Sequence, residues 1–222
     1  MEQILRKSME AIRPLDADAM EAARKRQMAL AKPPGSLGRL EDLSVQLAGI
    51  TGQVHNTVNR QHLLVFAADN GVVEEGVSSA PQSVTLMQTV NLTRAKTGAS
   101  VLAKHFGCGI TVCDVGVNAV IKEPAVLNRK IAFGTQNMTK GPAMTRQQAV
   151  QAILTGLGLA KETPADVLGI GEMGIGNTTT SSAVLSVLLN VEPEKVTGRG
   201  GGVTDEGFRK KKAAIQKAIA VN

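Results

Sequence analysis

A glycine-rich stretch at residues 166–182 combines the residue types and the spacing that could do chemistry. An apolar run at 167–170 breaks into glycines, and hydroxyl residues then lead into an apolar helical segment at 183–189; the glycines are Gly169, Gly171, Gly174 and Gly176. Backbone N–H groups at the start of a helix lack partners within it and carry the positive end of its dipole. The pattern therefore predicts an anion site beyond the carboxyl end of a strand.

Glu172 stands among these glycines, and two roles suit it equally well. Its carboxylate could hydrogen-bond the turn or the positive end of the following helix. It could also orient a ribose hydroxyl or stabilise positive charge that develops on a sugar carbon. Asn177 and Thr178 could cap the helix, with or without a phosphate contact. Lys211 lies in a charged helical segment where a solvated lysine is the ordinary case, and only the glycines at 200–202 suggest a phosphate role.

Residues 169–174 also fit, formally, the glycine fingerprint of dinucleotide-binding turns, with Glu192 as the downstream acid. A carboxylate at Glu172 inside such a turn would repel a pyrophosphate, and these units normally open a domain. A single phosphate is therefore favoured, and a nicotinamide-dependent oxidoreductase is the rival enzyme class. A Walker-type loop is excluded because no Gly-Lys-Ser/Thr sequence follows the glycines.

The elements that must position these residues alternate between strands and helices. Apolar runs predict buried strands at 62–68, 109–115 and 167–170, and helical patterns occupy 81–94, 98–106, 145–160 and 205–220. Thr145 and Gln148 predict a capping box at the start of the third of these helices. This order predicts right-handed βαβ units and a mostly parallel α/β sheet flanked by helices on both faces. The ligand of such a sheet lies at the carboxyl ends of the strands. Asp69, Asn70 and Asp114 also stand there, although an ordinary turn is the favoured explanation for them.

The segment before this sheet is helical. Residues 1–31 form two helical pieces broken near Pro14, with Asp16 placed to cap the second. Leucines at spacings of three and four then predict a helix that ends near Gly52. We therefore expect a helical lobe at 1–58 and a parallel α/β domain at 59–222.

Composition narrows the function classes. The chain has 222 residues, 43% of them hydrophobic, and a net charge of +6. Four Phe with no Trp or Tyr leave little surface on which bases could stack, so no nucleic-acid partner is expected. The three histidines fall on separate elements without metal spacing, so no metal is expected. No membrane-spanning run or secretion signal is found, and the predicted location is the cytoplasm.

Several motifs resemble one family in their order along the chain. They are residues 32–41, 67–73, 82–88, 114–116, 141–145 and 171–179. The sequence is similar over nearly its whole length to nicotinate-nucleotide:dimethylbenzimidazole phosphoribosyltransferases. The resemblance implies a Rossmann-like sheet with a smaller helical lobe, a homodimer and no cofactor.

The reaction implied by the resemblance belongs to the synthesis of the cobalamin nucleotide loop. The phosphoribosyl group of nicotinate mononucleotide moves to 5,6-dimethylbenzimidazole or a related base, which gives α-ribazole 5'-phosphate and nicotinate. The small-molecule partners are therefore a nucleotide and a benzimidazole base. Because the transition state carries a cation-like sugar, fixed negative charge beside the sugar and a clamp on the phosphate would both favour the reaction.

The resemblance also assigns residues to these substrates. It implies a benzimidazole pocket at Gln88 and places Glu172 and Met173 beside the substrates. The residues implied for the nucleotide phosphate are Gly174, Gly176, Asn177, Thr178, Gly200 and Lys211.

This sequence departs from the family pattern in three places. The glutamate that acts as general base in the family, in a glycine-rich loop near the carboxyl terminus, would lie beyond Asn222. We therefore expect a carboxyl-truncated chain with impaired catalysis, or a nucleotide-binding fragment that works with a partner chain. Asn70 stands where relatives often have His, and Ala80 stands where a polar residue could contact the base.

Overall fold

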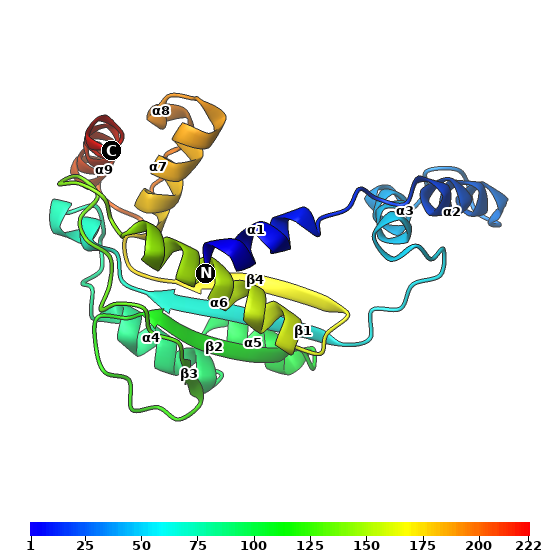
Figure 1. Cartoon of the computed structure of the whole chain (residues 1–222), viewed down its shortest axis with the longest axis horizontal. Coiled ribbons are helices and arrows are strands. Elements are labelled where there is room, and N and C mark those ends of the chain that lie inside the picture. The colour runs from blue at the N-terminus through cyan, green and yellow to red at the C-terminus, as the bar shows by residue number, and fades with distance from the viewer. The chain divides into compact units, whose positions relative to one another are not determined.

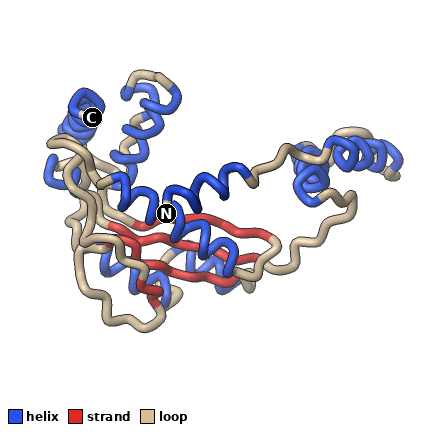
Figure 2. Tube along the Cα trace, viewed as in Figure 1, coloured by secondary structure: helices blue, strands red, loops and turns tan.

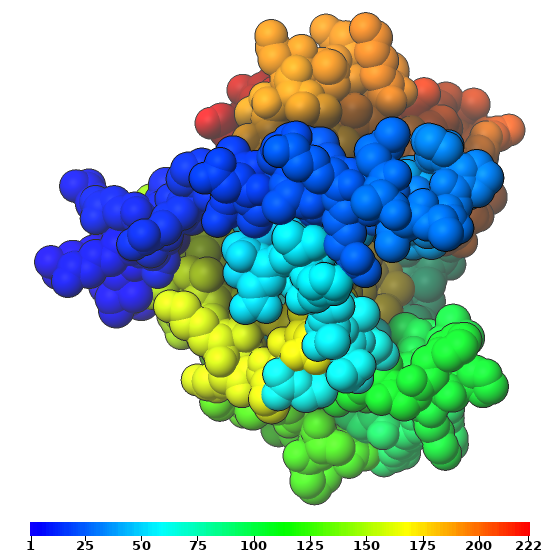
Figure 3. Space-filling view, turned by 90° about the vertical axis from the view of Figure 1, so that its right-hand side faces the viewer, coloured from blue at the N-terminus to red at the C-terminus, as the bar shows by residue number.

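The computed structural model describes residues 1–222, which form two compact units. The smaller unit is residues 2–59, and the larger is Met1 with residues 60–222. The smaller unit consists of the helices α1 (Glu2–Glu10), α2 (Ala17–Ala29) and α3 (Arg39–Thr51). The helices α2 and α3 pack side by side and form one block in the space-filling view (Figure 3).

Local sequence signals set the ends of these helices. The side chain of Asp16 accepts a hydrogen bond from the Ala19 N–H at 2.9 Å, so the predicted cap of α2 is confirmed. Gly52 ends α3 in the left-handed conformation at φ 69°, as its position after the periodic leucines suggested. Gly49 lies against Met20, where an added Cβ would be 2.7 Å from the Met20 Cγ. The two helices therefore approach closely at a residue without a side chain.

The larger unit is built on a four-stranded, all-parallel sheet with the order β3-β2-β1-β4. Its strands are β1 (Gln61–Ala68), β2 (Gly109–Gly116), β3 (Val126–Asn128) and β4 (Val167–Met173). The parallel α/β sheet predicted from the sequence is confirmed, and its first two strands lie within one residue of their expected bounds. The sequence did not indicate β3, because a three-residue strand is too short to show a period.

Helices cover both faces of this sheet (Figures 1 and 2). The helices of the larger unit are α4 (Val84–Thr93), α5 (Gly98–His105), α6 (Arg146–Glu162), α7 (Asn177–Leu189), α8 (Pro193–Val196) and α9 (Asp205–Val221), with a 3₁₀ turn, η1 (Gly71–Glu75), after β1. In Figure 1, α4 and α5 lie on one face and α6 lies on the other. The capping box predicted at Thr145 and Gln148 begins α6.

The core follows the two-residue alternation of the strands. On one face Val65 packs with Leu92 of α4, and on the other Leu64 packs with Leu159 of α6. A third cluster joins η1, α7 and α9 around Ile215, which is fully buried. That cluster fixes α9 against α7 at the carboxyl edge of the sheet. None of the helices has both the length and the apolarity that a membrane crossing needs.

Candidate functional site

The glycine turn begins later than the sequence suggested. The strand β4 runs to Met173, so Gly169, Gly171 and Glu172 lie in the strand and only Gly174 begins the turn. The prediction that all four glycines shape the turn is therefore wrong for the first two. In a dinucleotide fingerprint the first glycine makes the tight turn, and here Gly169 is extended backbone inside the sheet. This geometry counts against the nicotinamide-dependent alternative.

Two glycines of the turn are required by space and by backbone conformation. A Cβ at Gly174 would lie 2.1 Å from the Ala68 carbonyl oxygen, so no side chain fits there. Gly176 has φ 86°, which favours glycine, and it packs against Val73. The turn therefore lies directly on the carboxyl end of β1.

Side chains from two other elements hold the turn at Ile175. Its N–H donates to the Thr85 Oγ1 at 3.0 Å, and its carbonyl accepts from the Asn70 Nδ2 at 3.1 Å. The Thr180 hydroxyl donates to the Asn70 Oδ1 at 3.3 Å. Asn70 is thus more than the simple turn residue that the sequence favoured. Thr85 could not be found from the sequence, because nothing in a helical pattern marks a side chain that accepts a hydrogen bond from a distant backbone N–H.

The start of α7 does not offer the row of free amides that the sequence suggested. The N–H groups of Asn177 and Thr179 donate to the carbonyls of Gly174 and Gly176. The Thr178 N–H donates to the Asn177 Oδ1 at 2.7 Å, and the Ile175 N–H is held by Thr85. The expectation of an open backbone cradle is therefore wrong for these four amides, because the turn already supplies their acceptors.

Lys211 is the buried cation of the site. Its side chain is 1% exposed, and its Nζ donates to the Thr178 Oγ1 at 2.7 Å and to the Gly198 carbonyl at 2.9 Å. The sequence favoured a solvated lysine, and that expectation is wrong. These acceptors are a hydroxyl and a carbonyl rather than a carboxylate, so burial lowers the pKa of Lys211 below the usual lysine value.

Gly200 lies beside both Thr178 and Lys211. A Cβ at Gly200 would lie 2.7 Å from the Thr178 Oγ1 and 3.3 Å from the Lys211 Nζ, and its φ is 60°. The structure thus brings together Thr178, Gly200 and Lys211 from three separate segments. A buried ammonium beside an exposed hydroxyl and an unobstructed backbone can receive an anion.

Glu172 lies next to this group through Asn177, whose Nδ2 donates to the Glu172 Oε1. Glu172 is exposed by its surface area, yet neighbouring protein atoms displace enough water to raise the pKa of its carboxyl group. The hydrogen bond from Asn177 opposes that rise.

Met173 points to the opposite face of the sheet from Glu172, as neighbouring residues in a strand do. It packs in the cluster of Val65 and Leu92, on the face covered by α4. Gln88 is half-buried on the same helix. Glu172 therefore lies on the face of the sheet opposite to α4, whereas Met173 lies on the face that α4, the helix of Gln88, covers.

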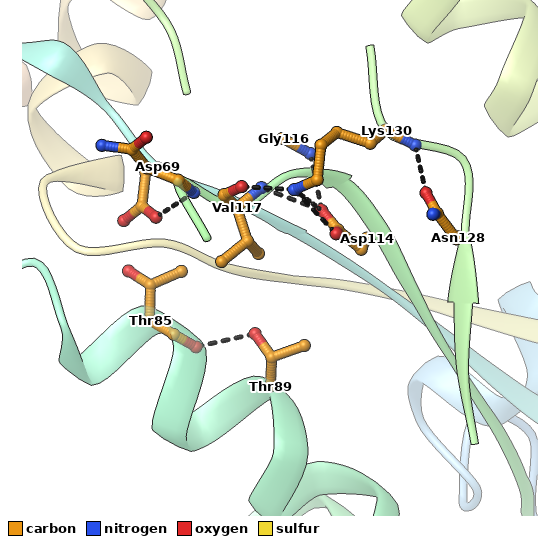
Figure 4. Close-up of polar contacts among 9 residues, drawn as sticks. Asp69, Thr85, Thr89, Asp114, Gly116, Val117, Asn128 and Lys130 are labelled. Carbon is orange, nitrogen blue, oxygen red and sulfur yellow. Dashed lines mark hydrogen bonds and ion pairs between the residues drawn. The ribbon is translucent and has the colours of Figure 1, made fainter. Parts of the chain in front are cut away.

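Buried polar groups brace the loops at the carboxyl ends of β1 and β2 (Figure 4). Asp114 is 2% exposed and accepts from the N–H groups of Gly116 and Val117 and from the Lys130 Nζ at 2.8 Å. The Asp69 Oδ2 accepts from the Asn118 N–H at 2.7 Å. These contacts agree with the turn roles favoured by the sequence. No three His, Cys, Asp or Glu side chains gather where they could hold a metal ion.

Comparison with known proteins agrees with this architecture. A family model described as a phosphoribosyltransferase (DBI_PRT) matches residues 12–222. The chain belongs to this phosphoribosyltransferase family. A family member from Alkaliphilus metalliredigens, the nicotinate-nucleotide-dimethylbenzimidazole phosphoribosyltransferase, is 49% identical over 98% of this chain and 64% of its own length. The corresponding protein from Clostridium tetani is 44% identical over 99% of this chain and 62% of its own length.

Comparison with solved structures also supports this family and its fold. The crystal structure of CobT from Thermus thermophilus superposes with a TM-score of 0.87 at 41% identity, over 91% of this chain and 62% of that chain. The Rossmann-like parallel sheet implied by the resemblance is therefore confirmed. The chain spans 62% to 64% of the length of these two curated family members.

The lowered pKa of Lys211 predicts a pH dependence of stability. Between the folded-state pKa and the usual lysine value, the unfolded chain binds more protons than the folded chain, so the free energy of unfolding should rise with pH across that alkaline window. Lys211→Met should remove this rise. Denaturant titrations of both proteins at a series of alkaline pH values measure the free energy of unfolding. A wild-type value that falls with pH relative to the variant would contradict a buried ammonium without a carboxylate partner.

Proposed function

We propose that this chain forms the phosphoribosyl site of a nicotinate-nucleotide:dimethylbenzimidazole phosphoribosyltransferase. The observation that carries the proposal is the group of Thr178, Gly200 and Lys211, which lies beside Glu172 at the carboxyl edge of the sheet. Family membership supports the reaction class, and the activity for which the family members are named indicates the substrates.

The phosphate of nicotinate mononucleotide would bind at Lys211. Its ammonium is buried without a carboxylate partner, so a phosphate would supply the missing negative charge. The Thr178 hydroxyl and the backbone of Gly200 would complete the contact, with Gly174, Gly176 and Asn177 shaping the turn behind it. The positive end of the α7 dipole would add to this attraction.

Glu172 would face the sugar. When the bond between the sugar carbon and the nicotinate nitrogen breaks, its electron pair leaves with nicotinate and positive charge develops on the sugar. A carboxylate at the end of β4 stabilises that charge before a benzimidazole nitrogen attacks the same carbon. The benzimidazole ring then gives its N–H proton to solvent water. Gln88 and Met173, on the face covered by α4, would line the pocket for the base.

Release of nicotinate from its mononucleotide, on addition of 5,6-dimethylbenzimidazole, tests this assignment. Glu172→Gln should lower kcat by about 10²-fold, because a neutral amide no longer offsets the charge on the sugar. Lys211→Ala should raise the KM for nicotinate mononucleotide by about 10-fold or more, since the phosphate loses its buried cation. Because the pKa of Glu172 is raised, kcat should fall on the acid side at a pH above the usual glutamate value, and Glu172→Gln should lack that limb.

Lys210→Ala is the matched control for the lysine variant. Lys210 is the neighbouring residue on α9, and its Nζ pairs with Glu206 in solvent at 2.7 Å. This variant should keep the wild-type KM. A Lys211→Ala protein with unchanged KM, or a Glu172→Gln protein with unchanged kcat, would contradict the assignment.

We also propose a homodimer that acts in the cytoplasm. Exposed apolar side chains at the end of α7 support an association surface; Val187, Leu188 and Leu189 are 61%, 76% and 59% exposed. Sedimentation equilibrium should give twice the 23.2 kDa chain mass. A single-chain mass at micromolar concentration would contradict the dimer.

A further inference from the structure

Thr85 links the glycine turn to the helix on the other side of the site. It lies in the first turn of α4 and is fully buried. Its Oγ1 accepts from the Ile175 N–H at 3.0 Å, and its own carbonyl accepts from the Thr89 hydroxyl at 2.7 Å, as Figure 4 shows for the second bond. The bond from Thr89 lies within α4, so it does not touch the turn. The hydroxyl that holds the turn therefore belongs to a helix that packs against the sheet.

The contact fixes the orientation of the turn rather than only filling space. Thr85 holds the N–H of Ile175 while Asn70 holds its carbonyl, so the peptide groups on both sides of this residue have side-chain anchors. A buried N–H without an acceptor is strongly unfavourable, so the turn would rotate to find another partner if the hydroxyl were lost. Such a rotation would move Gly176 and Thr178, which follow directly in the chain.

The same helix carries the residue assigned to the base. Gln88 lies three positions after Thr85, which puts the two side chains on neighbouring parts of one helix face. Further along α4, Leu92 packs into the core beneath β1. The helix is thus anchored to the sheet at one end and to the phosphate-facing turn at the other.

We propose that Thr85 is a positioning residue for the transfer reaction. By holding Ile175, it sets the separation between the phosphate-binding turn and the base-binding face of α4, so that the sugar carbon and the attacking nitrogen meet. This inference rests on the proposed function, and it adds a residue that contacts neither substrate.

The test compares three variants in the whole chain. Thr85→Val keeps the shape of the side chain but removes the acceptor, Thr85→Ser keeps the acceptor, and Thr89→Val removes the neighbouring hydroxyl without touching the turn. The dissociation constant of nicotinate mononucleotide is measured by calorimetry, and kcat and both KM values by nicotinate release. Exchange of the Ile175 amide hydrogen reports on the contact itself.

Thr85→Val should weaken binding of nicotinate mononucleotide by about 10-fold and lower kcat/KM further, because the acceptor of a half-buried amide is lost. Thr85→Ser and Thr89→Val should stay within about twofold of the wild type. The Ile175 amide should exchange slowly in the wild type and in Thr85→Ser, and faster in Thr85→Val.

Three outcomes would overturn the proposal. They are wild-type kinetics in Thr85→Val despite faster Ile175 exchange, equal losses in Thr85→Val and Thr89→Val, and a loss in Thr85→Ser as large as that in Thr85→Val. If Thr85→Val does not fold, Thr85→Ala, which removes the same acceptor, takes its place in all three comparisons. Failure of the wild type to bind nicotinate mononucleotide is a different result, since it would contradict the proposed function while Ile175 exchange still tests the anchor.

Discussion

The direct contact between Gly174 and the carboxyl end of β1 is the constraint on which the candidate site depends. The backbone of Gly174 is so close to the Ala68 carbonyl that no Cβ could be placed there. Because β4 leaves the sheet in this contact, Glu172 stays within hydrogen-bond reach of Asn177 at the start of α7. A wider turn would carry α7 outward and separate these groups. Because Gly174 has no side chain, the turn stays close to β1, and this close approach sets the positions of Glu172 and Asn177.

The sheet separates two kinds of chemistry at its carboxyl edge. Glu172 and the group around Lys211 offer charge and hydrogen bonds, whereas Met173 packs in an apolar cluster on the face covered by α4, the helix of Gln88. The substrates of the proposed reaction, a phosphorylated sugar and a flat aromatic base, would need such different surroundings. The alternation of a single strand would supply both with two consecutive residues.

Sequence reasoning succeeded where a signal is local or periodic. The strands at β1 and β2, the cap at Asp16 and the capping box at Thr145 all depend on nearby residues. It failed where the decisive contact is distant in the chain. The burial of Lys211 depends on Gly198 and Thr178, and the occupied amide of Ile175 depends on Thr85, 90 positions away. Neither the composition nor the residue spacing near Lys211 or Ile175 indicates these distant partners.

The sheet order also leaves one strand with a single neighbour. The strand β4 is at one end of the order and pairs only with β1, and Ile170 in its middle is 80% exposed. One row of its backbone N–H and C=O groups therefore has no partner strand in this sheet. An apolar strand with an open edge is a template for another extended segment. A further strand could join the sheet beside β4 through backbone hydrogen bonds, and it would cover Ile170.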